Sequence, residues 1–475
     1  RRHHCQELTA AARGQEVVLM GGVQRRRDHG GVIFVDLRDR EGLTQVVFNP
    51  AISPEVHDKA QALRNEYVIA VRGKVDHRPE GMTNPQLFTG EIEILVTELK
   101  ILNAAQTPPF MIEDQVDASE TIRLKHRHLD LRRAALQKNL MLRHKATASI
   151  RSFLNANGFL DIETPMLTRS TPEGARDYLV PSRVNPGTFF ALPQSPQIFK
   201  QLLMIAGFDR YYQIVKCFRD EDLRADRQPE FTQVDMEMSF VGEEDVMAVS
   251  EGLIAALFKD TLDEELQPPF ERLDYTEAIQ RFGLDKPDMR FGLELKELSD
   301  IVAQSDFKVF ANVVKNGGIV KALNAKGCST FSRKEIDDLT EYVAVYRAKG
   351  MALIKVKEDA WQSPIAKFFS EAEKAALTER LDMAPGDIVF FVADQPKVVN
   401  ESLGHLRNHL GQILGLIDPD EFRFVWVTHF PLMEYDENEK RYEALHHPFT
   451  APLDDDLANL TVKPEKVRSR AYDLV

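Results

Sequence analysis

Cysteine and tryptophan are scarce in this sequence, and long apolar runs are missing from it. Three cysteines, Cys5, Cys217 and Cys328, stand among 475 residues, an odd number at spacings too wide for a metal-binding pattern. This favours a reducing compartment over a disulfide framework, and we expect a cytoplasmic protein. No apolar run reaches the roughly 18 residues that a membrane helix needs, and the basic first residues lead into polar ones. The sequence therefore predicts neither a membrane span nor a signal peptide.

An excess of positive charge is also absent. Sixty basic residues face 74 acidic ones, for a net charge of −14, which argues against a protein that coats nucleic acid nonspecifically. A local basic track is present, because nine Lys or Arg and one acid, Asp130, stand between Thr121 and Arg151. The track could follow phosphates or be a solvated helix face, and both interpretations stay open. The length predicts two to four domains.

Residues 211–241 predict a β-hairpin with a charged mouth. Because strand side chains alternate, the outgoing strand has one face that packs and one polar face. The packing face would hold Val234, Met236, Met238 and Phe240, and the polar floor Gln233, Asp235, Glu237 and Ser239. The mouth carries Arg219, Asp220, Glu221, Arg224, Arg227 and Gln228. Arginine holds phosphate or carboxylate oxygens through paired hydrogen bonds, so the hairpin suits a phosphate-bearing ligand, although solvated ion pairs are the common alternative.

The sequence Phe-Arg-Asp-Glu at 218–221, followed by Arg-Gln-Pro-Glu-Phe at 227–231, resembles motif 2 of the class II aminoacyl-tRNA synthetases. In that family the hairpin arginine grips the α-phosphate of ATP, and the glutamate contacts the adenine side or the tRNA acceptor end. The resemblance implies ATP and Mg²⁺ as cofactors and Arg219 and Glu221 as catalytic residues. It implies ATP binding by Arg219, Asp220, Glu221 and Gln228, and it assigns no metal ligands.

A helix is predicted just before the hairpin. Ser195 and Pro196 predict its start, with the serine hydroxyl as the cap, and Gln197 and Lys200 then share one face. In aspartyl-tRNA synthetases, which the chain resembles, the matching positions line the amino-acid pocket. The implied aspartate-binding residues are Glu173, Gln197, Lys200, Arg219, Gln233, Asp235 and His446. A lysine and an arginine there favour a carboxylate over an amide, which would leave buried donors unpaired at about 1–3 kcal/mol each.

Residues 16–102 read as five short strands with a helix between the third and the fourth, the pattern of an OB-fold barrel that binds single-stranded nucleic acid. Phe34, taken alone, fits a core position better than a base-stacking one, and alternation does not decide which face of its strand is wet. In aspartyl-tRNA synthetases the matching arginine, phenylalanine and glutamine contact the anticodon. The implied anticodon set is Arg27, His29, Phe34, Gln45, Gly81 and Glu93, where Glu91 shares the face of Glu93.

The fold class implied is an N-terminal OB-fold barrel, a class II synthetase catalytic domain built on an antiparallel sheet, and an inserted mixed α+β domain. A helix leading into a strand that ends at Pro165 resembles motif 1, which forms the homodimer interface in the family. The resemblance implies that the inserted domain is of the GAD type, which is typical of bacterial aspartyl enzymes. The expected divisions are 1–103 for the barrel, 104–133 for a hinge, 134–284 and 419–475 for the two catalytic parts, and 285–418 for the insertion.

The resemblance implies an aspartate–tRNA ligase that charges tRNA(Asp). A histidine at position 29 with a glycine at 81 resembles the type that also charges tRNA(Asn), and this stays open. Class II enzymes also have a strand with a magnesium-holding acid and the glycine-rich motif 3. Neither occurs before Val475, so we expect a truncated chain that is itself inactive. Two alternatives remain, a noncatalytic tRNA-binding paralogue and an asparaginyl or lysyl ligase. Aspartate-dependent ATP–pyrophosphate exchange by the full-length product distinguishes the ligase from the noncatalytic paralogue. The insertion and Lys200 argue against an asparaginyl or lysyl ligase.

Overall fold

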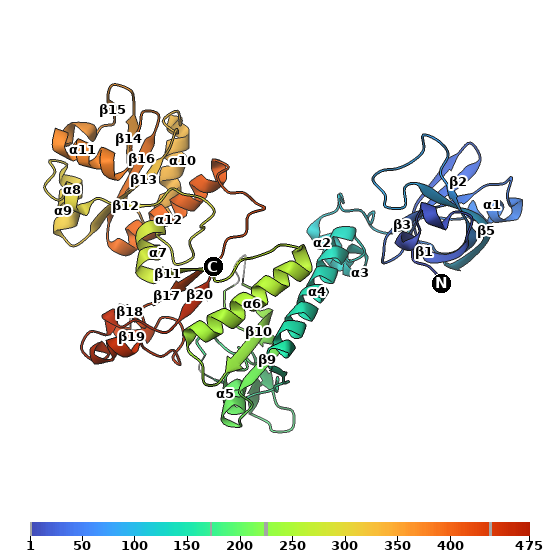
Figure 1. Ribbon diagram of the computed structural model, residues 1–475, viewed down its shortest axis with the longest axis horizontal. Coiled ribbons are helices and arrows are strands. Elements are labelled where there is room, and N and C mark those ends of the chain that lie inside the picture. Colours follow the sequence, from blue (N-terminus) through green and yellow to red (C-terminus); the bar gives the residue numbers. More distant parts are fainter. Residues whose placement is uncertain (1, 172, 223–226, 437–438) are drawn as a thin grey trace. The chain divides into compact units, whose positions relative to one another are not determined.

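The computed structural model describes residues 2–171, 173–222, 227–436 and 439–475. The chain forms two compact units, Arg1–Ala146 and Thr147–Val475. Figure 1 shows strands closed into a barrel in the first unit, and helices packed on sheets in the second. The finer divisions expected after residues 103, 133, 284 and 418 stay predictions.

The first unit contains a closed five-stranded barrel with the strand order β1-β2-β3-β5-β4. Its elements are β1 (Glu16–His29), β2 (Val32–Arg38), β3 (Leu43–Phe48), α1 (Pro54–Ala60), β4 (Val68–His77) and β5 (Ile92–Asn103), preceded by the 3₁₀ turns η1 (Cys5–Glu7) and η2 (Ala10–Ala12). β3 and β5 pair in parallel, and the other neighbours pair antiparallel. The helix between the third and fourth strands completes the OB-fold that the sequence predicts, which is confirmed.

Alternation along β2 decides which of its side chains enter the barrel. Ile33, Val35 and Leu37 are fully buried in the core, so Phe34 and Asp36 face outward between them. The inference that Phe34 alone fits the core is therefore wrong, because its strand neighbours take the inward positions. This outward placement makes Phe34 available to a ligand.

A helical segment follows the barrel, with α2 (Glu120–Lys125), α3 (Arg127–Asp130) and α4 (Ala134–Ala156). Arg132, just after α3, lies 2.7 Å from the buried carboxylate of Glu66, which Arg38 also binds at 3.0 Å. Two guanidinium groups on one carboxylate fasten this segment to the barrel. The chain leaves α4 through Gly158 with φ +78°, a left-handed conformation that suits glycine after a helix end.

The second unit begins with a three-stranded sheet of order β10-β9-β6. Its elements are β6 (Leu160–Asp161), β7 (Leu179–Pro181), β8 (Phe189–Ala191), α5 (Gln197–Ile205), β9 (Arg210–Phe218), β10 (Glu230–Met238) and α6 (Glu243–Leu262). The apolar face of the β9–β10 hairpin packs against Leu154 of α4 and Leu253 of α6. The opposite face is left for polar side chains.

A second small sheet, of order β11-β17-β20, pairs segments that are far apart in the sequence. β11 (Glu271–Asp274) runs parallel to β17 (Val425–Thr428), and β20 (Tyr472–Leu474) pairs with β17 antiparallel. The remaining elements here are β18 (Met433–Asp436), β19 (Arg441–Ala444), η4 (Asp454–Asn459) and η5 (Pro464–Lys466). Because β11 and β17 are neighbours, the chain between them is an excursion from one sheet.

The excursion builds its own antiparallel sheet of order β12-β13-β16-β14-β15. Its strands are β12 (Lys296–Glu297), β13 (Ile319–Ala325), β14 (Ala352–Val356), β15 (Trp361–Gln362) and β16 (Ile388–Asp394). Its helices are α7 (Tyr275–Phe282), α8 (Ser299–Val302), α9 (Lys308–Lys315), α10 (Arg333–Ala344), η3 (Ala366–Phe368), α11 (Glu371–Arg380) and α12 (Pro396–Ile413). Apolar clusters cover both faces, with Phe390 in one and Phe391 in the other. The mixed α+β insertion expected from the sequence is thus present as a structural element.

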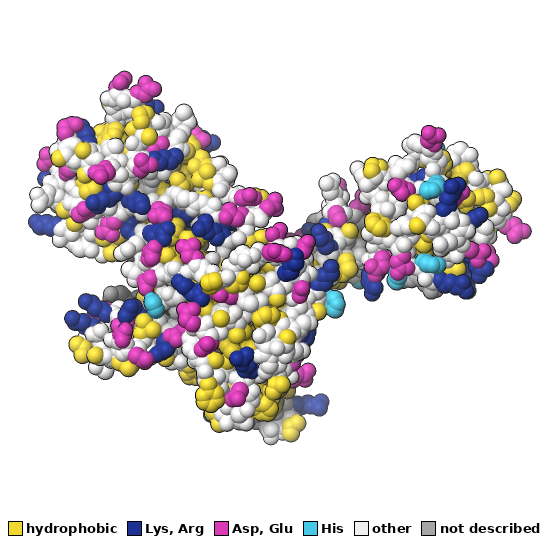
Figure 2. Space-filling view, in the orientation of Figure 1, with side chains coloured by type: hydrophobic (Ala, Val, Ile, Leu, Met, Phe, Trp, Pro, Cys, Tyr) yellow, Lys and Arg dark blue, Asp and Glu magenta, His cyan; other side chains and the backbone are white. Residues whose placement is uncertain are grey.

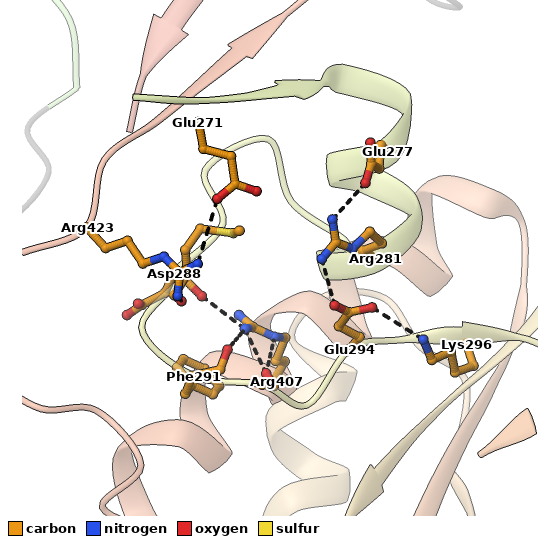
Figure 3. A network of polar contacts seen from close by, with 11 residues as sticks. Glu271, Glu277, Arg281, Asp288, Phe291, Glu294, Lys296, Arg407 and Arg423 are labelled. Carbon is orange, nitrogen blue, oxygen red and sulfur yellow. Dashed lines mark hydrogen bonds and ion pairs between the residues drawn. The ribbon is translucent and has the colours of Figure 1, made fainter. Parts of the chain in front are cut away.

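A fully buried arginine, Arg407, joins α12 to the loop that follows α7 (Figure 3). It donates to the backbone carbonyls of Asp288 at 2.9 Å, Phe291 at 2.7 Å and Gly292 at 2.8 Å. Burial lowers the pKa of Arg407 to about 10. The guanidinium therefore provides hydrogen-bond donors for backbone carbonyls of a loop that is not paired in a β-sheet.

A buried lysine, Lys321 of β13, joins the five-stranded sheet of the excursion to α7. Its ammonium donates to the carbonyls of Gln280 at 3.0 Å and Ile279 at 3.3 Å, near the C-terminal end of that helix. Burial lowers the pKa of Lys321 to about 8. A cation at a helix C-terminus satisfies carbonyls that have no partner within the helix.

Candidate functional site

The β9–β10 hairpin presents the predicted polar floor. The strands pair with Gln233 opposite Val215 and Asp235 opposite Gln213, so these side chains share one face. The face that packs is confirmed for Val234, Met236 and Met238 but is wrong for Phe240, which is 97% exposed. The strand ends at Met238, and Phe240 has φ +60°, so alternation no longer applies to it.

A lysine from α5 lies over the floor between two carboxylates. The Nζ of Lys200 is 3.0 Å from Oδ1 of Asp235 and 3.3 Å from Oε2 of Glu237. Gln233 also donates through Nε2 to Oδ1 of Asp235, at 3.0 Å. An ammonium group has three N–H donors, so these two contacts leave one donor for a ligand.

The second oxygen of Asp235 is the unusual atom of the floor. Asp235 is 2% exposed, and its Oδ2 is buried with no hydrogen-bond partner among the described residues. A buried acceptor without a donor costs about 1–3 kcal/mol, so the floor favours a ligand that brings a donor. An ammonium group is the donor that a carboxylate binds most strongly.

Cys217 of β9 lies on the same face and was not predicted as part of the site. Its Sγ is 3.9 Å from Oε1 of Gln233. Burial, reinforced by the nearby charge of Asp235, raises the pKa of the Cys217 thiol to about 11. The thiol is therefore protonated at neutral pH and acts as a weak donor rather than a nucleophile.

Glu173 is tied to the beginning of α5. Its carboxylate accepts from the hydroxyl of Ser195 at 2.6 Å and from the hydroxyl of Thr171 at 2.9 Å. The prediction that Ser195 caps α5 is wrong, since Pro196 is the N-cap residue and the serine hydroxyl goes to the stronger, charged acceptor. Gln197 and Lys200 both lie in the first turn of α5, as predicted.

Arg219 stands at the entrance of the hairpin. Its guanidinium lies 5.0 Å from the ring centre of Phe231, and its backbone N–H donates to the carbonyl of Pro229 at 2.9 Å. None of the ion pairs among the described residues involves Arg219. An arginine that lies against a ring and has no acid partner in the described part of the chain suits a phosphate group.

The rest of the mouth is only partly described. Residues 223–226, which include Arg224, lie outside the described residues. Glu221 and Arg227 form a long ion pair of 3.6 Å, and Gln228 is exposed. The backbone of Asp220 forms an isolated antiparallel β-bridge with that of Arg176. The ATP-binding roles of these side chains stay predictions.

His446 follows β19 and is exposed, and its ring packs edge-on against Phe430 at 4.5 Å between ring centres. The structure does not connect it to the polar floor through any described contact. Among the described residues, no group of three or more His, Cys, Asp or Glu side chains is placed to hold a metal ion. No helix in the described part of the chain is long and apolar enough to cross a membrane.

The barrel brings several predicted anticodon residues together on its outer face. Arg27 donates to Oδ1 of Asp36 at 2.6 Å and to Oε1 of Gln45 at 3.3 Å. Gln45 in turn donates to Oε2 of Glu93 at 2.9 Å, and Phe34 is opposite Arg27 in the β1–β2 pairing. We call Arg27, Phe34, Asp36, Gln45 and Glu93 the barrel outer face. Glu93, not the exposed Glu91, joins this network.

Burial shapes the charges near the barrel outer face. It raises the pKa of Glu93, while the hydrogen bond from Gln45 and the charge of Arg78 oppose the shift. Arg78 was not predicted. Its Nη2 is buried and has no hydrogen-bond partner in the described part of the chain, and burial lowers its pKa. Neither Arg78 nor Asp36 carries a signal in the sequence, because their closeness depends on how the barrel closes.

His29 and Gly81 lie in two exposed loops of the first unit. His29 ends β1 beside the turn formed by Gly30 and Gly31, whose φ values of +60° and +79° suit glycine. Gly81 follows β4 with φ +79° and has open space around it. No described contact joins His29 to Gly81.

Comparisons with known proteins agree with this architecture. A family model described as tRNA synthetases class II (D, K and N) matches residues 119–475, and one described as OB-fold nucleic acid binding domain matches residues 17–102. Asparaginyl-tRNA synthetase from Pyrococcus horikoshii, solved with asparaginyl-adenylate, has a TM-score of 0.52 at 18% identity and covers 89% of this chain and 99% of its own. That likeness supports the fold, and the family model over residues 119–475 places the chain among the class II aminoacyl-tRNA synthetases.

The relatives at high identity narrow the class. Aspartate–tRNA(Asp/Asn) ligases from Desulfosudis oleivorans and Desulfatibacillum aliphaticivorans are 66% and 67% identical to this chain over 475 and 476 residues. Each match covers 100% of this chain and 80% of the relative. The chain therefore belongs to the aspartate–tRNA ligase family of class II synthetases. This confirms the family, the ligase class and the fold expected from the sequence.

Proposed function

We propose that this protein activates L-aspartate with ATP and transfers the aspartyl group to tRNA. The α-carboxylate of aspartate attacks the α-phosphorus of ATP, pyrophosphate leaves, and aspartyl-adenylate forms. The 3′-hydroxyl of the terminal adenosine of tRNA then attacks the carbonyl carbon, and AMP leaves. The observation that carries the proposal is the buried, unpartnered oxygen of Asp235 beside Lys200 and within one hairpin of Arg219.

The proposed aspartate site uses the polar floor and its surroundings. Asp235 and Glu173 receive the α-ammonium of the ligand, since both present carboxylate oxygens. Lys200 keeps one donor for the side-chain carboxylate of aspartate, and Gln197, Gln233 and His446 complete the set. An asparagine side chain would face that ammonium with its own NH₂ and lose the interaction, which favours aspartate.

Arg219 is the proposed partner of the reacting phosphate. Negative charge builds on the oxygens of the α-phosphate as the carboxylate attacks, and a guanidinium placed beforehand stabilises that charge. Asp220, Glu221 and Gln228 complete the proposed ATP-binding set at the mouth, with Glu221 also catalytic. Mg²⁺, when bound with ATP, would neutralise the phosphate oxygens, and we assign no metal ligands in this chain.

The proposed RNA substrates are tRNA(Asp) and tRNA(Asn). The barrel outer face supplies an aromatic ring, an amide and a guanidinium, which suit stacking and base-edge hydrogen bonds. With His29 and Gly81 this completes the proposed anticodon set. The relatives' names, aspartate–tRNA(Asp/Asn) ligase, support the relaxed range. An enzyme of protein synthesis with this role would act in the cytoplasm.

The test measures aspartate-dependent ATP–pyrophosphate exchange and charging of both purified tRNAs, with protein made from the full reading frame. Exchange with aspartate but not with asparagine is expected. Absence of exchange would leave the noncatalytic tRNA-binding alternative, which the ligase relatives do not favour. Charging of tRNA(Asp) without tRNA(Asn) would remove the relaxed range and leave the ligase activity in place.

We also propose a homodimer through the segment that resembles motif 1, at the end of α4 and in β6. Leu160 of β6 and Leu167, shortly after it, are 48% and 52% exposed. Figure 2 shows further hydrophobic side chains gathered near α5, where Ile205 is 83% exposed. Apolar surface of this kind marks protein interfaces. Light scattering that gives the mass of one chain would contradict the dimer.

A further inference from the structure

A groove lies on the side of the β1–β2 hairpin opposite to the barrel outer face. Successive strand residues point to opposite faces, so Arg26 leaves β1 on the side away from Arg27. The groove has a volume of about 1010 Å³ and lies entirely within the first unit. Its polar lining comes from β1, from the turn after α1 and from the segment after β5.

Arg26 is held in this groove with part of its hydrogen-bonding capacity unused. Its side chain is 22% exposed, and its ion pair with Asp28 is long, at 3.6 Å. Its Nε is buried and has no partner among the described residues. A buried guanidinium N–H without an acceptor is unfavourable, so the site favours a ligand that supplies an oxygen.

Arg64 provides the second positive charge. Its Nη1 donates to the carbonyls of Gln61 at 2.9 Å and Leu63 at 2.8 Å, which holds the side chain in place. No ion pair among the described residues involves Arg64. The groove thus holds two guanidinium groups against one carboxylate, that of Asp28.

Amide side chains fill the space between these charges. Gln61, Asn65 and Gln106 line the groove, and each carries both donors and an acceptor. Phosphate oxygens suit the guanidinium groups, and ribose hydroxyls suit the amides. The volume of the groove is at the upper end of the roughly 300–1,000 Å³ range of small-ligand pockets, and the groove is open. It therefore suits a polymer segment better than a metabolite.

We propose that this groove binds the ribose–phosphate backbone of the tRNA whose anticodon bases lie on the barrel outer face. The proposal rests on the proposed function and adds a contact that carries no base sequence. The RNA strand would straddle the β1–β2 hairpin, with bases on the Phe34 side and phosphates on the Arg26 side. Backbone contacts of this kind fix the register of the bases, whereas the outer face discriminates between them.

The first experiment removes both charges with the double variant Arg26→Gln/Arg64→Gln. Filter binding of transcribed tRNA(Asp) at several salt concentrations should show affinity about tenfold lower and a log–log salt slope smaller by about 1.5. The matched control is Arg72→Gln, which removes an exposed barrel arginine of β4 that pairs with Glu98 at 3.2 Å. The control should bind like the unmodified chain. Equal affinity of the double variant and the control would overturn the proposal.

A second variant guards against loss by misfolding. Asp28→Asn removes the acid of the groove and should tighten tRNA binding about two- to threefold, a gain that an unfolded chain does not produce. Unchanged or weaker binding would count against the groove. The double substitution should lower the affinity for anticodon-mutant tRNAs by the same factor as the affinity for tRNA(Asp). A loss of affinity that depends on the anticodon bases would assign both arginines to base reading. Failure of the proposed function looks different, because the full-length protein without substitutions would then lack aspartate-dependent ATP–pyrophosphate exchange or bind no tRNA, whereas failure of the groove proposal leaves both intact.

Discussion

The barrel outer face and the polar floor treat their polar side chains in opposite ways. On the barrel, Arg27, Gln45 and Glu93 are linked by described hydrogen bonds, and the network is largely satisfied before any ligand arrives. On the floor, Oδ2 of Asp235 is buried without a described partner. A satisfied surface gains little net energy from one more polar contact, whereas an unsatisfied acceptor gains the full desolvation cost back. The barrel is thus suited to selecting shapes, and the floor to binding a charged group tightly.

The largest expected effect follows from removing the cation at the entrance of the hairpin. Arg219→Gln should lower aspartate-dependent ATP–pyrophosphate exchange by about 10³-fold or more, because charge developing on the phosphate loses its partner. Lys216→Gln is the matched control, since Lys216 of β9 lies three residues before Arg219 and pairs with Glu230 at the surface. Similar exchange rates in the two variants would contradict the assignment of Arg219.

The next effect tests the unpartnered oxygen itself. Asp235→Asn should raise the KM for aspartate about a hundredfold, equivalent to about 2.7 kcal/mol, because the ligand ammonium loses its charged acceptor. Glu237→Gln alters the other acid beside Lys200. The side chain of Glu237 is 30% exposed, so this substitution should have a much smaller effect on the KM for aspartate. If both variants gave the same KM, the floor would act through its net charge and not through Asp235.

A smaller effect is expected on the barrel, because one base contact contributes less than a buried charge. Gln45→Ala should lower kcat/KM for tRNA charging about tenfold, mainly through the KM for tRNA. Gln15→Ala, at an exposed position before β1, is the control and should leave that KM unchanged. A change in the KM for aspartate would show that the barrel variant had disturbed the other unit.

The smallest effect concerns the pH dependence of stability. The pKa of Glu93 is raised in the folded protein above its ordinary value of 4.5, chiefly by burial. The folded state therefore binds this proton more tightly, and its contribution to stability falls as the pH rises from about 4.5 through the raised pKa. Glu93→Gln should remove that fall, so urea midpoints of the two proteins should diverge with rising pH. Parallel curves would mean that Glu93 is already ionised at no cost.

Much of this molecule follows from local sequence patterns. The alternation in residues 233–238 predicts both faces of β10 correctly, because a strand has one rule for all its side chains. That rule fails at Phe240, where the strand has ended and the backbone turns with φ +60°. The cap at Ser195 fails for a different reason, since its hydroxyl meets the carboxylate of Glu173 from 22 residues earlier in the chain.

Contacts across the barrel were beyond prediction from local patterns. The side of β2 that carries Phe34 depends on which strands close against it, and alternation leaves that choice open. Asp36 reaches the barrel outer face through the pairing of β2 with β1 and β3. Arg78 lies beside that face because it follows β4, which pairs with β5, at sequence distances that no single motif spans. The resemblance to a family named Gln45 and Glu93, and the structure adds the hydrogen bond that joins them.

The two buried cations that fasten the inserted sheet, Lys321 and Arg407, bear on how this protein could be shortened. Excising only residues 293–424, which contain β12 to α12, while keeping α7 and the 288–292 loop would strip α7 of the amine at its last turn and leave the loop carbonyls facing solvent or each other. A trimmed enzyme would therefore require redesign of that helix end and loop in the same step, and deletion alone would yield a destabilised product.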